Sequence, residues 1–211
     1  MGGAEMAMDV GPFLDPATTA VLVVETQANL LDPDNPRIPG LAKSAHDMDL
    51  VGHIAALNHA ARDAGVRIIF INNSWRDHGI GRPTNDLIRG RASGGEWSGG
   101  LGPVAPGLDP QPQDLIIERE LGLTSFASSP LDNYLRNLGI KSVVITGMSA
   151  NLAVLGTTIE ATNAGYKSTV LSDCIAGDPP EYVPYLLKYT IRNIALVTTS
   201  DVVIDHWKSL S

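Results

Sequence analysis

The chain has 211 residues, of which 44% are hydrophobic and 18% charged, and its formal net charge is −8. Acidic chains repel phosphate, so this balance argues against nucleic acid or an anionic membrane surface as a partner. The single cysteine, Cys174, excludes an internal disulfide, and no apolar run approaches the roughly 18 residues that span a bilayer. We expect one cytoplasmic domain over residues 18–211, preceded by a flexible, Gly-rich leader over residues 1–17.

Apolar runs of β-branched type alternate with stretches of helical periodicity along the chain. In order, the pattern predicts a strand at 20–24, a helix at 47–64, strands at 66–71 and 115–117, a helix at 130–138, a strand at 142–146, a helix at 151–164, a strand at 168–171, a helix at 181–192 and a weaker strand at 194–197. This alternation predicts a three-layer α/β/α fold with a parallel sheet covered on both faces.

Residues 72–113 interrupt the alternation with Gly, Pro, Trp and charged residues that show no period. A loop of this length in a compact domain is usually a functional lid or an assembly arm. We interpret Trp75 as a pocket wall and Trp97 as an interface anchor, and expect a homo-oligomer, either a dimer or a tetramer.

Ligands of open α/β sheets bind beyond the carboxyl ends of the strands. The residues that follow the predicted strands should therefore form the site: Glu25–Asn29, Asn72–His78, Arg119–Phe126, Gly147–Ala153 and Asp173–Gly177.

The most specific motif is the segment ITGMSANLAVLGTTIEATNAGY at residues 145–166. Together with residues 20–30 and 116–126 it resembles the isochorismatase-like hydrolases, also called the cysteine hydrolase family. The resemblance runs from about residue 19 to 207 and implies a six-stranded parallel sheet of order 3-2-1-4-5-6. It also implies a cysteine nucleophile at a helix start, an Asp base, a Lys, a cis peptide between Met148 and Ser149, and a backbone oxyanion hole in the turn of Ser149 and Asn151.

The chain departs from this pattern at all three catalytic positions. Glu25 stands where the family has Asp, and Ala153 where it has the cysteine. The Lys position falls on Arg119 or Glu120, and Arg119 is favoured because it follows a strand end and keeps the positive charge. A methyl group cannot attack a carbonyl, so covalent thiol catalysis at residue 153 is excluded.

Two functions of different classes remain open. In the first, Glu25 is the acid/base of a non-covalent hydrolysis of a small vinyl ether or amide, with Arg119 holding charge. In the second, Glu25 and Arg119 form a structural pair in an inactive family member that binds a small molecule or a partner. The expected substrate-binding residues are Gln27, Trp75, Phe126, Met148, Ser149 and Asn151.

Other chemistries are disfavoured by spacing. Gly147-Met-Ser149 lacks the second Gly of a serine nucleophile elbow. Asp77 and His78 are adjacent with no second His in the loop, so we expect no metal, and no cofactor motif is present. Cys174 is interpreted as a small buried hydrophobe.

Overall fold

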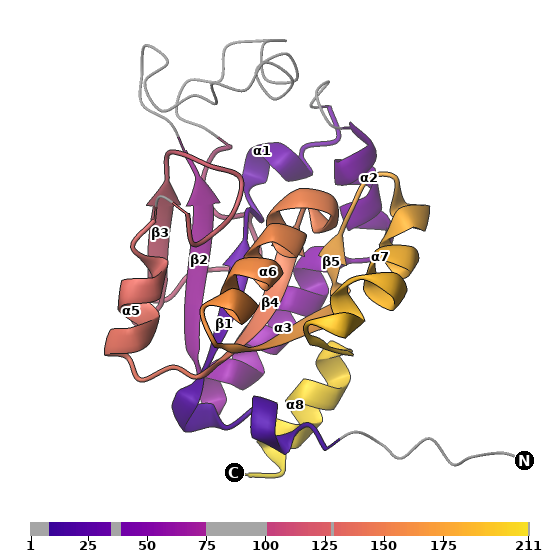
Figure 1. Ribbon diagram of the computed structural model, residues 1–211. Coiled ribbons are helices and arrows are strands. Elements are labelled where there is room, and N and C mark those ends of the chain that lie inside the picture. Colours follow the sequence, from indigo (N-terminus) through magenta and orange to yellow (C-terminus); the bar gives the residue numbers. More distant parts are fainter. Residues whose placement is uncertain (1–8, 35–38, 75–100, 128, 211) are drawn as a thin grey trace, which may run out of the picture.

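The computed structural model describes residues 9–34, 39–74, 101–127 and 129–210. Its centre is a six-stranded sheet in which every neighbouring pair is parallel, in the order β3-β2-β1-β4-β5-β6 (Figure 1). The strands are β1 (Thr19–Val24), β2 (Arg67–Asn73), β3 (Leu115–Arg119), β4 (Ser142–Met148), β5 (Lys167–Ala176) and β6 (Leu196–Thr198). The predicted fold class and strand order are both confirmed.

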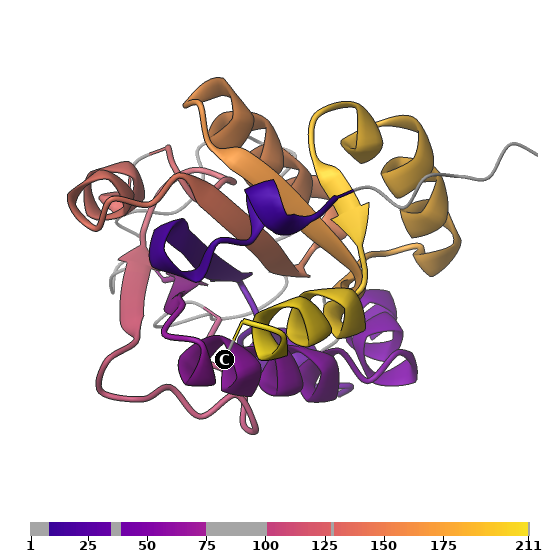
Figure 2. The same ribbon diagram turned by 90° about the horizontal axis from the view of Figure 1, so that it is seen from below.

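Helices cover both faces of the sheet. One face carries α5 (Leu131–Asn137), α6 (Leu155–Asn163) and α7 (Val183–Tyr189), and the other carries α2 (Pro39–Asp47), α3 (Leu50–Asp63) and α8 (Ser200–Lys208), as Figure 2 shows from below. The short α1 (Ala28–Leu31) follows β1, and 3-10 turns η5 (Pro180–Tyr182) and η6 (Ile191–Asn193) flank α7. None of these helices is long and apolar enough to cross a membrane.

The alternating strand side chains build two separate cores. Val21, Val23 and Val144 pack against α3 and α8, whereas Leu22, Ile145 and Val170 pack against α5, α6 and α7. Such double burial explains why the strands appear in the sequence as continuous apolar runs instead of alternating ones.

The folded part of the chain begins earlier than the sequence suggests. Residues 9–17 were expected in the leader. They contain the 3-10 turn η1 (Gly11–Phe13) and the start of a second one, η2 (Pro16–Thr18). Leu14 is fully buried, and its carbonyl accepts a hydrogen bond from Trp207 Nε1 at 2.9 Å. This contact with the last helix fixes the segment. Residues 1–8 lie outside the described part of the chain.

Candidate functional site

Glu25 follows β1 at the carboxyl end of the sheet, in a left-handed backbone conformation with φ of 46°. Its N–H still donates to Ile71 O at 2.9 Å, as a continuation of the β1–β2 ladder. Beyond it, the Thr26 hydroxyl donates to Val24 O at 3.1 Å. Left-handed backbone is uncommon for a residue with a side chain and marks a turn that its surroundings enforce. The carboxylate is thereby held at the end of the strand, with 13% of the side chain exposed.

Arg119 ends β3 and is almost completely buried, with 1% exposed. Its Nη2 donates to Glu25 Oε1, while Nη1 donates to the carbonyl oxygens of Leu121, at 3.2 Å, and Gly122. Because β2 lies between β3 and β1, the pair bridges a strand. The side chain that meets Glu25 is thus that of Arg119, one of the two residues that the resemblance offers for the family's Lys position.

Burial lowers the pKa of Arg119 to about 10, and the charge of Glu160 opposes this shift. The guanidinium therefore remains protonated at neutral pH, since its pKa stays well above 7. Among the described residues, its Nε has no hydrogen-bond partner.

Ala153 lies in η4 (Ala150–Val154), a turn of π-helix between β4 and α6, and is 3% exposed. The chain reaches η4 through Gly147, which has φ of 106°. A Cβ at Gly147 would lie 2.0 Å from Val24 O, so only glycine lets β4 pass this close to the end of β1. The Met148–Ser149 peptide is cis, as the resemblance implied. Residue 153, to which the resemblance assigns the nucleophile, thus follows directly on the turn that packs beside Glu25.

Gln27 is completely buried, and its amide is fully used by the backbone. Oε1 accepts from Asn73 N at 2.7 Å, and Nε2 donates to Asn73 O at 3.1 Å and to Gly102 O at 2.6 Å. The amide ties the end of β2 to the segment that begins at Leu101. The sequence assigned Gln27 to substrate binding, and in the structure its amide is hydrogen-bonded to the backbone of Asn73 and Gly102.

The turn residues after β4 have different surroundings. Met148 is fully buried in the core on the α3 side. The Asn151 amide is engaged with the backbone of Asp178, donating to its carbonyl at 2.8 Å and accepting from its N–H at 3.2 Å. The side chain of Ser149 makes no hydrogen bond within the described residues. Of the three, only Ser149 keeps an uncommitted polar group.

Phe126 is not placed beside Glu25. Its ring packs against Tyr166, with 5.9 Å between centroids, and its N–H donates to Glu160 Oε2 at 3.2 Å. Tyr166 precedes β5, at the opposite end of the sheet from the site. The chain after Arg119 runs along α6 away from the site, so these contacts do not support the expected substrate-binding role of Phe126. Trp75, the expected pocket wall, and Trp97, the expected interface anchor, lie outside the described residues.

The contacts of Thr124 and Ser125 with α6 were not anticipated from the sequence. A Cβ at Gly156 would lie 2.3 Å from Thr124 Cγ2, so the absence of a side chain there allows close approach. The Ser125 and Thr157 hydroxyls are 2.7 Å apart, and both residues are fully buried. Polar Ser and Thr in a loop and a helix give no sequence signal that they will meet. Together they fix the chain after Arg119 against the helix that carries residue 153.

Neither a reactive thiol nor a metal cluster is found in the described residues. Cys174 lies within β5, fully buried, and burial followed by the charge of Asp173 raises the pKa of its thiol. No group of three His, Cys, Asp or Glu side chains in the ranges 9–34, 39–74, 101–127 and 129–210 could hold a metal ion. Asp77 and His78 lie outside these ranges.

Comparison with known proteins decides the family, because the model of the isochorismatase domain matches residues 19–202. The chain is a member of the isochorismatase-like hydrolase family. It is 30% identical to ureidoacrylate amidohydrolase RutB of Caulobacter vibrioides, over 89% of this chain and 91% of the relative. RutB of Pantoea ananatis is 28% identical over 84% of this chain and 76% of its own.

Solved structures of the isochorismatase family have the same fold. A cysteine hydrolase from Pseudomonas syringae pv. phaseolicola superimposes with a TM-score of 0.77 at 24% identity, covering 94% of this chain and 96% of that one. N-carbamoylsarcosine amidase from Thermoplasma acidophilum gives a TM-score of 0.69 at 22% identity, covering 87% and 97%. The site described above therefore lies on an isochorismatase-family sheet, with alanine at the position that resemblance assigns to the nucleophile.

Proposed function

We propose that this protein hydrolyses a small amide without a covalent thiol intermediate, with Glu25 as the acid/base. The observation that carries the proposal is the nearly buried pair of Glu25 and Arg119 beside a nucleophile position occupied by Ala153. Relatives named as ureidoacrylate amidohydrolases and as a carbamoylsarcosine amidase support an amide substrate over other carbonyl compounds.

The ion pair with Arg119 favours Glu25 as a base, and not as an acid, in the first step of the reaction. An adjacent guanidinium stabilises the ionised carboxylate, which can accept a proton but cannot donate one. A vinyl ether must first be protonated, whereas amide hydrolysis begins with removal of a proton from water. Within the described residues only Oε1 of Glu25 is hydrogen-bonded, so Oε2 remains available to a water molecule.

The proposed reaction balances with water as the nucleophile. Glu25 takes one proton from water as its oxygen bonds to the amide carbon, and the negative charge moves to the carbonyl oxygen. The resemblance assigns stabilisation of that charge to backbone N–H groups of the turn at Ser149 and Asn151. Glu25 then returns the proton to the departing nitrogen as the C–N bond breaks, which yields a carboxylic or carbamic acid and an amine or ammonia.

Arg119 holds charge in this scheme and does not transfer protons. Its pKa of about 10 keeps it protonated at neutral pH, and its two carbonyl contacts fix the plane of the guanidinium. A guanidinium is a poor proton shuttle compared with the lysine of the family pattern. The proton relay is therefore assigned to Glu25 alone.

A panel of small amides, ureas, cyclic imides and vinyl ethers, assayed with the wild-type protein and with Glu25→Gln, tests the proposal. We expect turnover of an amide or urea by the wild type and its loss in Glu25→Gln. Turnover of vinyl ethers alone would contradict the base role. Binding of a panel member by calorimetry, with no turnover of any compound, would instead support an inactive member that binds a small molecule.

A further inference from the structure

The loop that follows β3 is the partner of the Arg119 guanidinium on the side away from Glu25. Nη1 of Arg119 donates to the carbonyl oxygens of Leu121, at 3.2 Å, and of Gly122. We call residues 120–126, which belong to no helix or strand, the Arg119 loop. Because the donors of a guanidinium form a rigid, planar fork, the position of these two carbonyls sets the direction in which Nη2 points toward Glu25. The loop thus controls how the cation is aimed.

A buried hydroxyl on α6 anchors the far part of this loop. The N–H of Ser125 donates to Thr157 Oγ1 at 3.2 Å, and the hydroxyl oxygens of the two residues are 2.7 Å apart. Both residues are fully buried, so loss of the Thr157 hydroxyl leaves polar groups of Ser125 unpaired and away from water. At the preceding position of the helix, Gly156 leaves room for the side chain of Thr124. The Thr157 hydroxyl therefore fixes the Arg119 loop to α6.

A carboxylate on the same helix holds the end of the loop. Glu160 lies three residues after Thr157, on the same face of α6, and its Oε2 accepts a hydrogen bond from the Phe126 N–H at 3.2 Å. Burial lowers the pKa of the Arg119 guanidinium, and the negative charge of Glu160 opposes that shift. Glu160 thus supplies an acceptor for the loop and a charge that favours protonated Arg119.

We infer that Thr157 and Glu160 are positioning residues for catalysis: they hold the Arg119 loop against α6, and the loop holds the guanidinium at Glu25. The inference rests on the proposed function, because it concerns the cation that keeps the proposed base ionised. No hydrogen bond or ion pair joins either residue to Glu25 within the described part of the chain, so each acts through Arg119. Since α6 directly follows η4, the turn that contains Ala153, one helix sets the position of the ion pair relative to that turn.

Thr158 provides a matched control for the Thr157 hydroxyl. It is the next residue of α6 and is also fully buried, but its hydroxyl donates to Val154 O, at 2.8 Å, one turn earlier in the same helical segment. Thr158→Val therefore removes a buried hydroxyl from α6 without altering a contact of the Arg119 loop. An effect that Thr157→Val and Thr158→Val share belongs to the packing of α6 and not to the position of Arg119.

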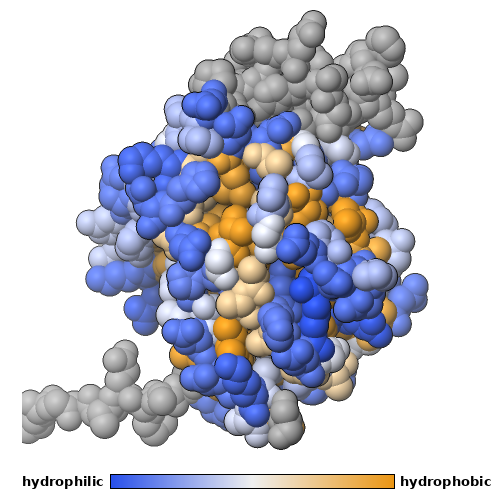
Figure 3. Space-filling view, turned by 180° about the vertical axis from the view of Figure 1, so that it is seen from behind, coloured by the Kyte–Doolittle hydropathy of each residue, from blue (hydrophilic) through white to orange (hydrophobic). Residues whose placement is uncertain are grey.

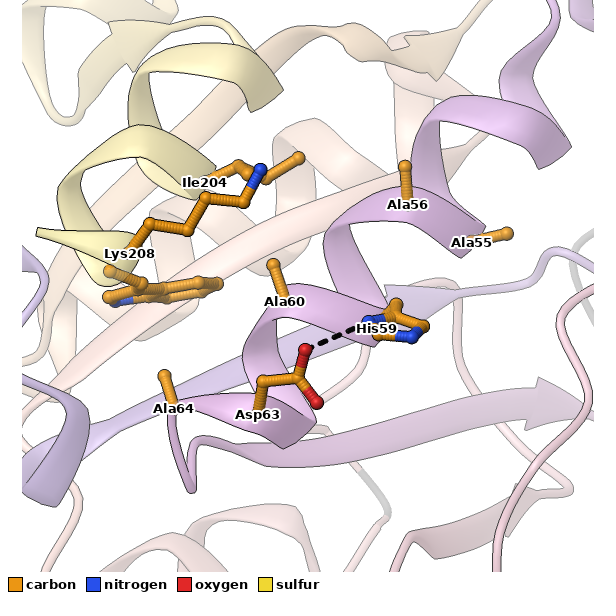
Figure 4. A pocket seen from close by; sticks show the side chains of 9 residues that line it. Ala55, Ala56, His59, Ala60, Asp63, Ala64, Ile204 and Lys208 are labelled. Atoms are coloured by element: carbon orange, nitrogen blue, oxygen red, sulfur yellow. Dashed lines mark ion pairs between the residues drawn. The ribbon is translucent and has the colours of Figure 1, made fainter. Parts of the chain in front are cut away.

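The opposite face of the sheet supplies a control for Glu160. Apolar residues gather along the middle of this face between hydrophilic flanks (Figure 3), and a groove of about 490 Å³ lies between α3 and α8 (Figure 4). On the rim of the groove, Asp63 pairs with His59 of the preceding turn of α3 at 3.0 Å. Asp63→Ala thus removes a helix carboxylate and its contact on the face that does not carry the Arg119 loop.

The values of kcat and KM for the best amide substrate test the role of Thr157 in the full-length protein. We expect Thr157→Val to lower kcat by about 10–100-fold, as a small misplacement of catalytic groups does, with KM changed by less than about twofold. Thr157→Ser keeps the hydroxyl, so it should retain the wild-type kcat, as should Thr158→Val. A Thr157→Val variant with wild-type kcat, or an equal loss in Thr158→Val, would overturn the inference.

Glu160→Ala should lower kcat in the same way, because it removes the acceptor of the Phe126 N–H. Glu160→Gln keeps a side-chain oxygen at this position, so it should retain more activity than Glu160→Ala. Asp63→Ala should have the kcat of the wild type. Equal kcat values in Glu160→Ala and Asp63→Ala would overturn the role of Glu160. Circular dichroism verifies that each variant is folded.

A double-variant cycle separates an effect through Arg119 from a general one. Arg119→Lys keeps the positive charge but loses the fork that contacts both loop carbonyls. In that background Thr157→Val should lower kcat by less than about threefold, because the loop no longer aims the cation. The full loss of kcat on top of Arg119→Lys would show that Thr157 acts by another route and would overturn the inference.

The same cycle in urea gives a readout that does not depend on turnover. Thr157→Val should shift the unfolding midpoint less in Arg119→Lys than in wild type, whereas Thr158→Val should shift both proteins equally. Equal shifts by Thr157→Val in the two backgrounds would overturn the inference even if the wild type hydrolyses amides. A wild type that turns over no compound of the panel would contradict the proposed function instead, and the urea cycle would then decide whether Thr157 positions Arg119.

Discussion

The guanidinium of Arg119 donates a hydrogen bond to the carboxylate of Glu25 across the end of an intervening strand, although the two residues are 94 positions apart in the chain. The parallel sheet makes this possible, because it gathers the carboxyl ends of β1 and β3 at one edge. In the resemblance, Asp and Lys occupy these positions, so the charges are kept while both side chains change. Glu25 has a longer side chain than Asp, and the guanidinium of Arg119 offers a fork of hydrogen-bond donors. Arg119 therefore suits the role of a fixed, protonated partner of Glu25 better than that of a group that exchanges protons.

Removal of one member of this pair should destabilise the protein more than removal of both. Arg119→Met leaves a carboxylate that is nearly buried and unpaired, which typically costs about 3–5 kcal/mol in the free energy of unfolding. Urea denaturation should show part of that loss recovered in the double variant Glu25→Gln/Arg119→Met. As a control, Arg136→Met removes an exposed pair with Asp132 and should have a far smaller effect. Equal losses of stability in Arg119→Met and Arg136→Met would contradict this expectation.

Gln27 should affect both stability and turnover from a buried position. Gln27→Ala leaves the backbone groups of Asn73 and Gly102 without their partner, at an expected cost of about 1–3 kcal/mol. We also expect kcat to fall with little change in KM, because Gln27 positions the site and does not touch the substrate in our assignment. Gln111→Ala is the matched control, because among the described residues the side-chain amide of Gln111 bonds only to the nearby Asp109 carbonyl, at 2.8 Å. A rise in KM alone would instead indicate direct substrate contact.

Introducing a thiol at residue 153 should change the chemistry of the site. Ala153→Cys places a nucleophile in η4, and we expect amide hydrolysis that becomes sensitive to iodoacetamide, most strongly when combined with Glu25→Asp and Arg119→Lys. The wild-type activity should be insensitive to the same reagent. Intact-protein mass spectrometry during turnover should detect an acyl adduct only in the cysteine variants. An adduct on wild-type protein would contradict a non-covalent mechanism.

Cys174 should remain unreactive in the folded protein. Burial and the neighbouring charge of Asp173 raise the pKa of its thiol, so less thiolate is present at any given pH than for a free cysteine. Iodoacetamide at pH 8 should leave the native chain unmodified and label it fully in denaturing urea. Rapid labelling of the native protein with loss of activity would move the nucleophilic role to this residue.

Sequence patterns were sufficient for the sheet but not for the details of its edge. Doubly buried strands give long apolar runs, so all six strands and the four helices at α3, α5, α6 and α7 were anticipated. Helices α2 and α8 were not anticipated, although each of them has an apolar face that packs on the sheet. The positions of Glu25, Arg119 and Ala153 came from family resemblance and strand ends. The hydrogen bonds of the Gln27 amide to the backbone and the packing of Phe126 on Tyr166 depend on tertiary contacts that no local pattern encodes.

Glu25 is proposed to move the proton in hydrolysis, and the measurement that tests this role most directly is kcat/KM for the best amide substrate in three proteins. Wild type, Glu25→Gln and Glu118→Gln should be compared, since Glu118 is an exposed carboxylate on the same strand as Arg119. General acid/base catalysis predicts a loss of roughly 10²–10⁴-fold in Glu25→Gln, with Glu118→Gln close to wild type. A Glu25→Gln protein that retains its kcat/KM within a few-fold would show that the proton is carried elsewhere and would contradict the account.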